Sequence, residues 1–185
     1  VYDSAYRDRS LHRRTIHSAL ADARRGKGIV TAGDRIPLSP NVTLHILYPP
    51  TGLALRTADD KTVVACLEVR TEAATRRILF SSDAGFSTEA WLHEHYPGLR
   101  CDVWVKGFHA KDPLSSPEWL STVAPSLIVA AVPRFPPKPL PPGWEDDLAR
   151  RGIRLLRQDE TGAVILTIDA NGEWAAHPFL RSSAR

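Results

Sequence analysis

Two side chains could bind a metal ion, and each of them comes immediately after an apolar segment of the sequence. Asp83 follows residues 78–82, and His109 follows residues 102–108. Apolar and β-branched runs are typical of strands, and a rigid strand end is a suitable position for a ligand. A carboxylate oxygen and an imidazole nitrogen together suit Zn²⁺ or Mn²⁺. A catalytic zinc needs three protein ligands, so this pair predicts an incomplete site. The alternative is an aspartate that caps a turn and a histidine on the surface.

The elements that must position these two residues mix strand and helix patterns. Apolar, β-branched runs predict strands at residues 42–46, 62–70, 77–82, 102–106, 127–132, 153–157, 163–168 and 173–176. Apolar faces and capping residues predict helices at residues 10–25, 87–95, from Ser116 onward, and 144–151. The proline-rich residues 133–143 are predicted to form a loop. This mixed order predicts an α/β fold of layered sheets flanked by helices.

The other histidine and cysteine patterns add no further ligand set. His93 and His95 fall at a predicted helix end, where their side chains would point about 200° apart around the axis. We therefore expect two separate surface residues. The only two cysteines, Cys66 and Cys101, cannot form a disulfide framework and make no C-x-x-C motif. Cys66 lies in an apolar run and is predicted to be a core residue, while pairing between the two cysteines stays open.

Positive charge is concentrated near the start of the chain. Residues 1–30 hold seven Lys or Arg and three Asp, whereas the other residues hold 17 basic and 18 acidic side chains. Any attraction to nucleic acid must therefore come mainly from this segment, and Arg9, Arg13 and Arg24 are the candidate contacts. The alternative is a solvated helix face. The longest apolar stretches are far shorter than the ~20 residues of a membrane helix.

Three sequence blocks together resemble a known family. The runs are LFSSDAGFSTEAWL, CDVWVKGFHAKDPLSSPEWLSTVAPSLIVAAV and GIRLLRQDETGAVIL. Their order and spacing resemble the C-terminal metallo-β-lactamase-like domain of ComEC-type competence proteins, which take up DNA. The resemblance covers about residues 41–176. It implies an αββα sandwich of the metallo-β-lactamase type, of which residues 1–185 form one partial domain, the C-terminal portion. Residues 1–40 would be a linking helix and strand, and residues 177–185 a tail.

The resemblance also assigns roles to individual residues. Asp83 falls on the family's metal-bridging aspartate, and His109 falls on the second histidine of a His-His pair, with Phe108 in place of the first. Ser82 replaces a glycine, and the Gly-Ser after the histidine pair is absent. The family's principal metal motif, His-x-His-x-Asp-His, does not occur in this sequence and would belong upstream of it. Asp83 and His109 are thus the predicted catalytic and metal-binding residues of an incomplete site, and the chain alone is predicted to be inactive.

The function implied by the resemblance is metal-dependent hydrolysis of phosphodiester bonds in incoming DNA, with Zn²⁺ or Mn²⁺ activating a water molecule. The domain would lie outside the cytoplasm, attached to the membrane channel part of a bacterial inner-membrane protein, and would bind single- or double-stranded DNA without sequence preference. One alternative is a degenerate, non-catalytic module that binds DNA or a protein partner; another is a hydrolase of small molecules. If the chain is a metal-dependent hydrolase, of DNA or of small molecules, Asp83 and His109 are expected to lie at neighbouring strand ends and to face one cleft.

Overall fold

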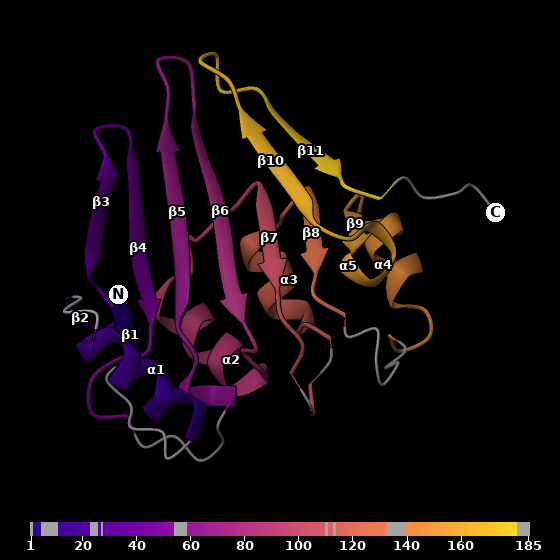
Figure 1. Ribbon diagram of the computed structural model, residues 1–185. Coiled ribbons are helices and arrows are strands. Elements are labelled where there is room, and N and C mark those ends of the chain that lie inside the picture. Colours follow the sequence, from indigo (N-terminus) through magenta and orange to yellow (C-terminus); the bar gives the residue numbers. More distant parts are fainter. Residues whose placement is uncertain are drawn as a thin grey trace.

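A seven-stranded mixed sheet organises the computed structural model (Figure 1). The structure describes residues 2–4, 11–22, 26, 28–53, 59–109, 111–112, 114–132 and 140–180, apart from the side chains of Arg13 and Asp59. The strands, in their order across the sheet, are β3 (Arg35–Ser39), β4 (Val42–Tyr48), β5 (Val64–Arg70), β6 (Thr75–Ser82), β7 (Val103–Lys106), β8 (Leu127–Ala130) and β9 (Arg154–Arg157). Neighbours from β3 to β6 are antiparallel, and neighbours from β6 to β9 are parallel. The carboxyl ends of β6, β7, β8 and β9 therefore meet at one edge.

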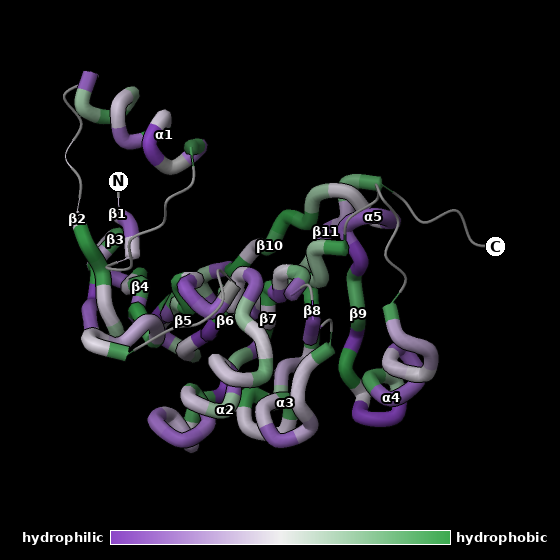
Figure 2. Tube along the Cα trace, turned by 90° about the horizontal axis from the view of Figure 1, so that it is seen from below, coloured by the Kyte–Doolittle hydropathy of each residue, from purple (hydrophilic) through white to green (hydrophobic). Residues whose placement is uncertain are grey.

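Three helices cover one face of this sheet. They are α2 (Phe86–His95), α3 (Pro117–Val123) and α4 (Trp144–Arg150), and they lie together on one side of the strands (Figures 1 and 2). The largest buried side chains on this face are Trp104 of β7 and Trp119 of α3, both with 0% exposure. Successive side chains of a strand point to opposite faces, so Trp104 faces the helices while its neighbour Val103 belongs to the core of the other face.

The opposite face carries smaller elements. A two-stranded antiparallel sheet, β10 (Val164–Ile168) and β11 (Trp174–Pro178), packs on the apolar side chains of β6 to β9. A short parallel pair, β1 (Tyr2–Ser4) and β2 (Gly28–Val30), lies near β4, where Val30 packs with Ile46. The remaining elements are α1 (Leu11–Asp22), the short helix α5 (Gln158–Thr161) and a 3-10 turn (Asp59–Lys61). None of the helices in the described ranges combines the length and hydropathy that spanning a membrane requires.

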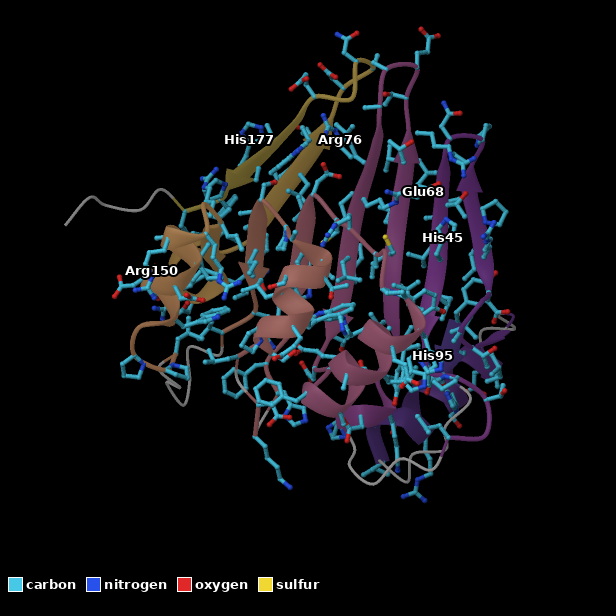
Figure 3. The ribbon with its side chains drawn as sticks, turned by 180° about the vertical axis from the view of Figure 1, so that it is seen from behind. His45, Glu68, Arg76, His95, Arg150 and His177 are labelled. Atoms are coloured by element: carbon cyan, nitrogen blue, oxygen red, sulfur yellow. The ribbon has the colours of Figure 1, made fainter. Side chains whose placement is uncertain are left out.

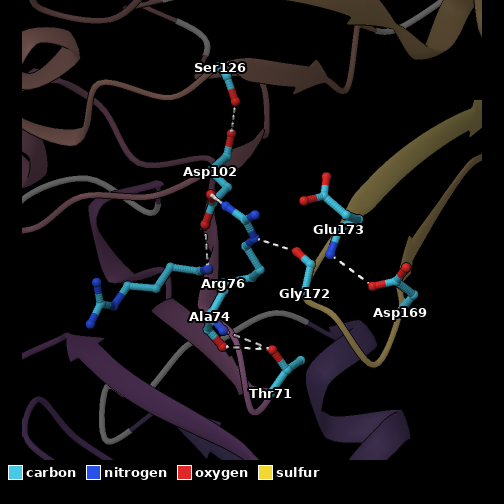
Figure 4. A network of polar contacts seen from close by, with 9 residues as sticks. Thr71, Ala74, Arg76, Asp102, Ser126, Asp169, Gly172 and Glu173 are labelled. Carbon is cyan, nitrogen blue, oxygen red and sulfur yellow. Dashed lines mark hydrogen bonds and ion pairs between the residues drawn. The ribbon is translucent and has the colours of Figure 1, made fainter.

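Arg76 joins the β10–β11 hairpin to the main sheet (Figure 4). Its Nε donates to the carbonyl of Gly172 at 2.6 Å, and its guanidinium donates to Asp102 at 3.0 Å. A Cβ atom at Gly172 would lie 2.8 Å from Cβ of Ala74 and 2.9 Å from Oγ1 of Thr71. Only glycine, which also has φ +79° here, allows the hairpin turn to approach the β5–β6 turn this closely.

The structure confirms most of the predicted elements, with shifts at their ends. The helix start at Ser116 is confirmed in detail, because Ser116 Oγ accepts the N–H of Trp119 at 3.2 Å and Pro117 occupies the first turn. Strand β3 was not predicted, because Pro37 interrupts its pattern, and it lies at the sheet edge, where proline is tolerated. Residues 158–161 form the short helix α5, which was not predicted. The mixed α/β class is confirmed.

Candidate functional site

An open pocket of about 340 Å³ lies at the carboxyl ends of the parallel strands. Each of β6, β7, β8 and β9 contributes at least one residue that follows it. The described residues that line the pocket are Asp83, Phe108, Ala131, Val132 and Gln158. In α/β sheets the crevice outside the carboxyl ends of parallel strands is the usual position of a ligand. This pocket is therefore the candidate site.

Asp83 links the ends of β6 and β7. Its Oδ1 accepts the N–H of Phe108 at 3.1 Å, and the carbonyl of Ser82 accepts the N–H of Gly107 at 2.7 Å. A Cβ atom at Gly107 would collide with both Oδ1 of Asp83 and the Ser82 carbonyl, so only glycine allows this approach. Ser82 itself has φ +48°, in the left-handed region that favours glycine. The backbone at this strand end thus fits the glycine that the resembled family has in place of Ser82.

His109 is buried beside the loop that follows Asp83, with 4% exposure. Its Nδ1 accepts two backbone N–H groups, from Asp112 at 2.9 Å and from Lys111 at 3.2 Å. Its Nε2 packs against Gly85, where an added Cβ would lie only 2.7 Å away. Asp112 in turn accepts the N–H of Phe86, the first residue of α2, at 3.0 Å. The segment after β7 is therefore fixed to the N-terminal end of α2.

Two charged side chains are buried between the sheet and the helices. Lys106, the last residue of β7, and Glu89 of α2 are each only 1% exposed. Glu89 Oε2 accepts the N–H of Ser116 at 2.7 Å, but Glu89 Oε1 and Lys106 Nζ have no hydrogen-bond partner among the described residues. Lys106 Nζ lies 5.8 Å from the centre of the Trp104 ring. Buried charges of this kind are costly unless they are paired or neutralised.

Burial dominates the protonation of this pair. It raises the pKa of Glu89 from 4.5 to about 7, although the Ser116 N–H and the charge of Lys106 act in the opposite direction. Burial also lowers the pKa of Lys106, against the charges of Glu89, Asp83 and Asp112. Both shifts favour the neutral forms, as desolvation in a low dielectric requires. Glu89 therefore changes its protonation state close to neutral pH.

The structure places Asp83 and His109 after neighbouring parallel strands. Of the two, only Asp83 lines the described part of the pocket, whereas His109 is buried with its Nε2 against Gly85. The predicted DNA contacts cannot be placed: Arg9 and Arg24 lie outside the described residues, and so does the side chain of Arg13. Among described residues no three His, Cys, Asp or Glu side chains gather as a metal site would require. Because Nδ1 of His109 is already engaged, the donor set present does not fit a zinc centre.

The other polar residues singled out in the sequence have structural roles. His93 bonds Thr122 of α3 at 2.6 Å, and His95 stacks on Trp91 at 3.9 Å, so the two do not share a site. Cys66 and Cys101 are both free and buried, and burial raises the pKa of the Cys66 thiol to about 12. These contacts confirm the prediction of separate histidines and of a core role for Cys66.

A second charged cluster lies beyond the helices, on the long strands β4 to β6 (Figure 3). Glu68 Oε1 contacts Arg70 at 2.7 Å and Oε2 contacts Arg77 at 3.2 Å, while His45 Nε2 lies 4.0 Å away. Burial opposes ionisation of Glu68, but its bonds to Arg70 and Arg77 outweigh burial and lower its pKa. Both oxygens of the Glu68 carboxylate are thus bound by arginines of β5 and β6.

Four residues near the site were not identified from the sequence as site residues: Glu89, Lys106, Asp112 and Gln158. Glu89 lies in the first turn of α2, where an acidic residue is favourable near the positive end of the helix, so its position gives no sign of a site. Lys106 ends an apolar strand pattern and could have drawn attention as a charge at a buried position. For Asp112 and Gln158 the sequence offers no signal, because their positions depend on packing between distant elements.

No protein-family model and no curated protein matches this chain. Among solved structures, the chain is similar to a crystal structure described as a "Putative metal-dependent hydrolase" from Parabacteroides distasonis ATCC 8503, with 12% sequence identity and a TM-score of 0.48. The similarity covers 77% of this chain and 61% of that one, so this chain spans less than two thirds of that structure. A likeness of this extent assigns neither a metal nor a reaction to the chain.

Proposed function

We propose that this chain is a metallo-β-lactamase-type module of a ComEC-like DNA-uptake protein, and that it binds DNA without hydrolysing it. The observation that carries this proposal is the donor set at the strand ends. Asp83 and His109 stand where the resemblance expects metal ligands, yet Asp83 Oδ1 and His109 Nδ1 accept backbone N–H groups and no third ligand gathers beside them among described residues. The positive φ of Ser82, at the family's glycine position, supports the resemblance itself.

The charges of the site indicate where DNA would bind. The strand-end region holds the carboxyl groups of Asp83 and Asp112, and the one buried cation among its described residues, Lys106, has a lowered pKa. Phosphate groups would be repelled from such a region. We therefore assign the phosphate contacts to the basic segment that contains Arg9, Arg13 and Arg24. In this proposal the module lies outside the cytoplasm, attached to the membrane channel part of its parent protein.

Fluorescence anisotropy with single-stranded and duplex oligonucleotides tests DNA binding. Each neutralised phosphate changes the slope of log affinity against log salt by about −0.7 to −0.9, so two to four contacts predict a slope of roughly −1.5 to −3.5. Replacing the three basic-segment arginines together by alanine should weaken binding to all sequences equally and flatten the slope.

The matched control replaces three exposed arginines near α4, namely Arg150, Arg151 and Arg154, by alanine. This variant loses the same charge but should bind DNA as the wild type does. Equal losses in both triple variants would indicate a net-charge effect and refute the assignment. Absence of DNA binding by the wild type would refute the proposed function.

One observation favours a second candidate, a metal-dependent phosphodiester hydrolase. The pocket lies at the carboxyl ends of four parallel strands and exposes Asp83, as an active site would. A plasmid-nicking assay with Mn²⁺ or Zn²⁺ separates the two functions. We expect no turnover. Turnover that is lost in Asp83→Asn, and retained in the exposed Asp146→Asn, would establish the hydrolase instead.

A further inference from the structure

The hydrogen bonds of His109 define where its ring carries a proton. The N–H groups of Lys111 and Asp112 both point at Nδ1, at 3.2 and 2.9 Å. A backbone amide always carries its hydrogen and can only donate, so Nδ1 must be the acceptor. A neutral imidazole has one donor and one acceptor nitrogen, and its hydrogen must then be on Nε2.

Among the described residues, one competing contact could reverse this assignment. Asp112 Oδ2 lies 3.6 Å from Nδ1, and a hydrogen on Nδ1 could face it as an ion pair. This separation is too long for a hydrogen bond. The same carboxylate oxygen accepts the N–H of Phe86 at 3.0 Å, and this bond holds it at that distance from the ring. The two backbone donors therefore decide the tautomer.

This tautomer is the reverse of the one that metal binding through Nε2 requires, and the two N–H groups occupy the lone pair that binding through Nδ1 would use. A histidine that binds zinc gives a lone pair from one nitrogen and donates the N–H of the other to a carboxylate, carbonyl or water. In His109 the lone pair of Nδ1 faces two N–H groups, and Nε2 carries the hydrogen. Nε2 is also packed against Gly85, where a Cβ atom would lie 2.7 Å away. Zinc binding at His109 would require its contacts with Lys111 and Asp112, or with Gly85, to break.

We infer that His109 is fixed as the Nε2–H tautomer and is a positioning residue that closes the turn after β7, and not a metal ligand. Side chains of Asn and Asp close similar turns by accepting N–H groups two or three residues ahead. Closing this turn orients Asp112 toward the first N–H of α2 and so fixes the strand-end loop to that helix. The inference goes beyond the proposed function and does not depend on DNA binding.

Long-range ¹H–¹⁵N correlation of the histidine rings tests the tautomer directly. The spectrum of the full chain at pH 7.5 contains seven histidines, and His109 is identified by the signals missing in His109→Asn. We expect Nδ1 of His109 to resonate as an unprotonated nitrogen and Nε2 as a protonated one, and both to be unchanged by one equivalent of Zn²⁺. A protonated Nδ1, or a zinc-induced shift of Nε2, would overturn the inference whether or not DNA binds.

Two substitutions provide an independent test. In Asn the polar atoms occupy the position of Nδ1, one bond beyond Cγ, whereas in Gln they lie one bond further, near the position of Nε2. Because the turn needs an acceptor at Nδ1, His109→Asn should keep a urea midpoint close to that of the wild type, and His109→Gln should lose more. The opposite order, or tighter zinc binding by the wild type than by both variants, would assign the essential role to Nε2 and refute the inference. If both variants fail to fold, single variants of the other six histidines identify the His109 signals by elimination, and the wild-type spectrum then decides alone.

Discussion

Glu89 should make the stability of this protein depend on pH in an unusual direction. Its pKa is about 7 in the folded chain and 4.5 for an ordinary glutamate. Between these values the unfolded chain releases the proton of Glu89 while the folded chain keeps it. The folded state therefore binds more protons, and its stability falls as pH rises from 4.5 to 7. Most carboxylates have the opposite effect, as Glu68 does with its lowered pKa.

The difference between the two pKa values is about 2.5, and each pH unit corresponds to about 1.4 kcal/mol, which gives a penalty of about 3 kcal/mol above pH 7. Glu89→Gln removes the ionisation but keeps a side-chain oxygen that can accept the N–H of Ser116. Relative to this variant, the wild type should lose about 3 kcal/mol of stability between pH 4.5 and pH 8. The charged groups nearest Glu89 are Lys106 and Asp112, and Lys106 has its lowered pKa within the same cluster. Its contribution favours folding as the pH rises, and Lys106 is present in both the wild type and Glu89→Gln.

Urea unfolding followed by tryptophan fluorescence measures this difference, because Trp104 and Trp119 are fully buried and report on the core. The free energies of unfolding of the wild type and Glu89→Gln are compared at pH 5, 6, 7 and 8. Glu94→Gln, an exposed residue of the same helix, controls for the loss of one negative charge. A wild-type-minus-variant difference that stays constant with pH, or that grows in favour of the wild type as pH rises, would refute the argument.

Three further substitutions test the strand ends and the hairpin. Gly107→Ala should cost about 2–3 kcal/mol in urea unfolding, because its Cβ would collide with Asp83 Oδ1, whereas Gly98→Ala, with no atom near its Cβ, should cost far less. Ser82→Gly should raise the unfolding free energy by about 1 kcal/mol, since φ is +48° there; a loss would show that the serine side chain has a role of its own. Arg76→Ala should cost about 1–2 kcal/mol and speed hydrogen exchange in the β10–β11 turn, and Arg76→Lys should recover only part of the loss.

The fold class could be predicted because local patterns specify most elements. The β-branched and apolar run of residues 62–70 predicts β5, the apolar run within residues 77–82 predicts β6, and the Ser116-Pro117 pair predicts the start of α3. The edge strand β3 could not be predicted, since Pro37 removes its pattern and only pairing with β4 forms the strand. The strand order across the sheet could not be predicted either, because it depends on contacts between residues far apart in the sequence.

The candidate site was predictable in its position but not in its electrostatics. Asp83 and His109 could each be placed at a strand end, because a polar residue that follows an apolar run marks a strand end, whereas only the resemblance implied that the two strands are neighbours. The burial of Glu89 and Lys106 could not be predicted, since such residues are almost always exposed. Their burial follows from the packing of α2 and α3 on β7, where Ser116 reaches Glu89. The raised pKa of Glu89 is therefore a property of the assembled layer.

A match to a ligand motif places the backbone of a residue, whereas its chemistry depends on which atoms remain available. In this chain, neighbouring backbone groups decide which atoms of Asp83 and His109 remain available for a ligand. Gly107 lets the backbone approach Asp83 closely enough for the Phe108 N–H to bind its Oδ1, and the turn after β7 directs two N–H groups at His109 Nδ1. A carboxylate has lone pairs left after one such bond, but an imidazole has only one acceptor nitrogen. The same backbone contacts are therefore compatible with ligand binding at Asp83 and incompatible with it at His109, which is why the histidine tautomer is the sharper test of what this site does.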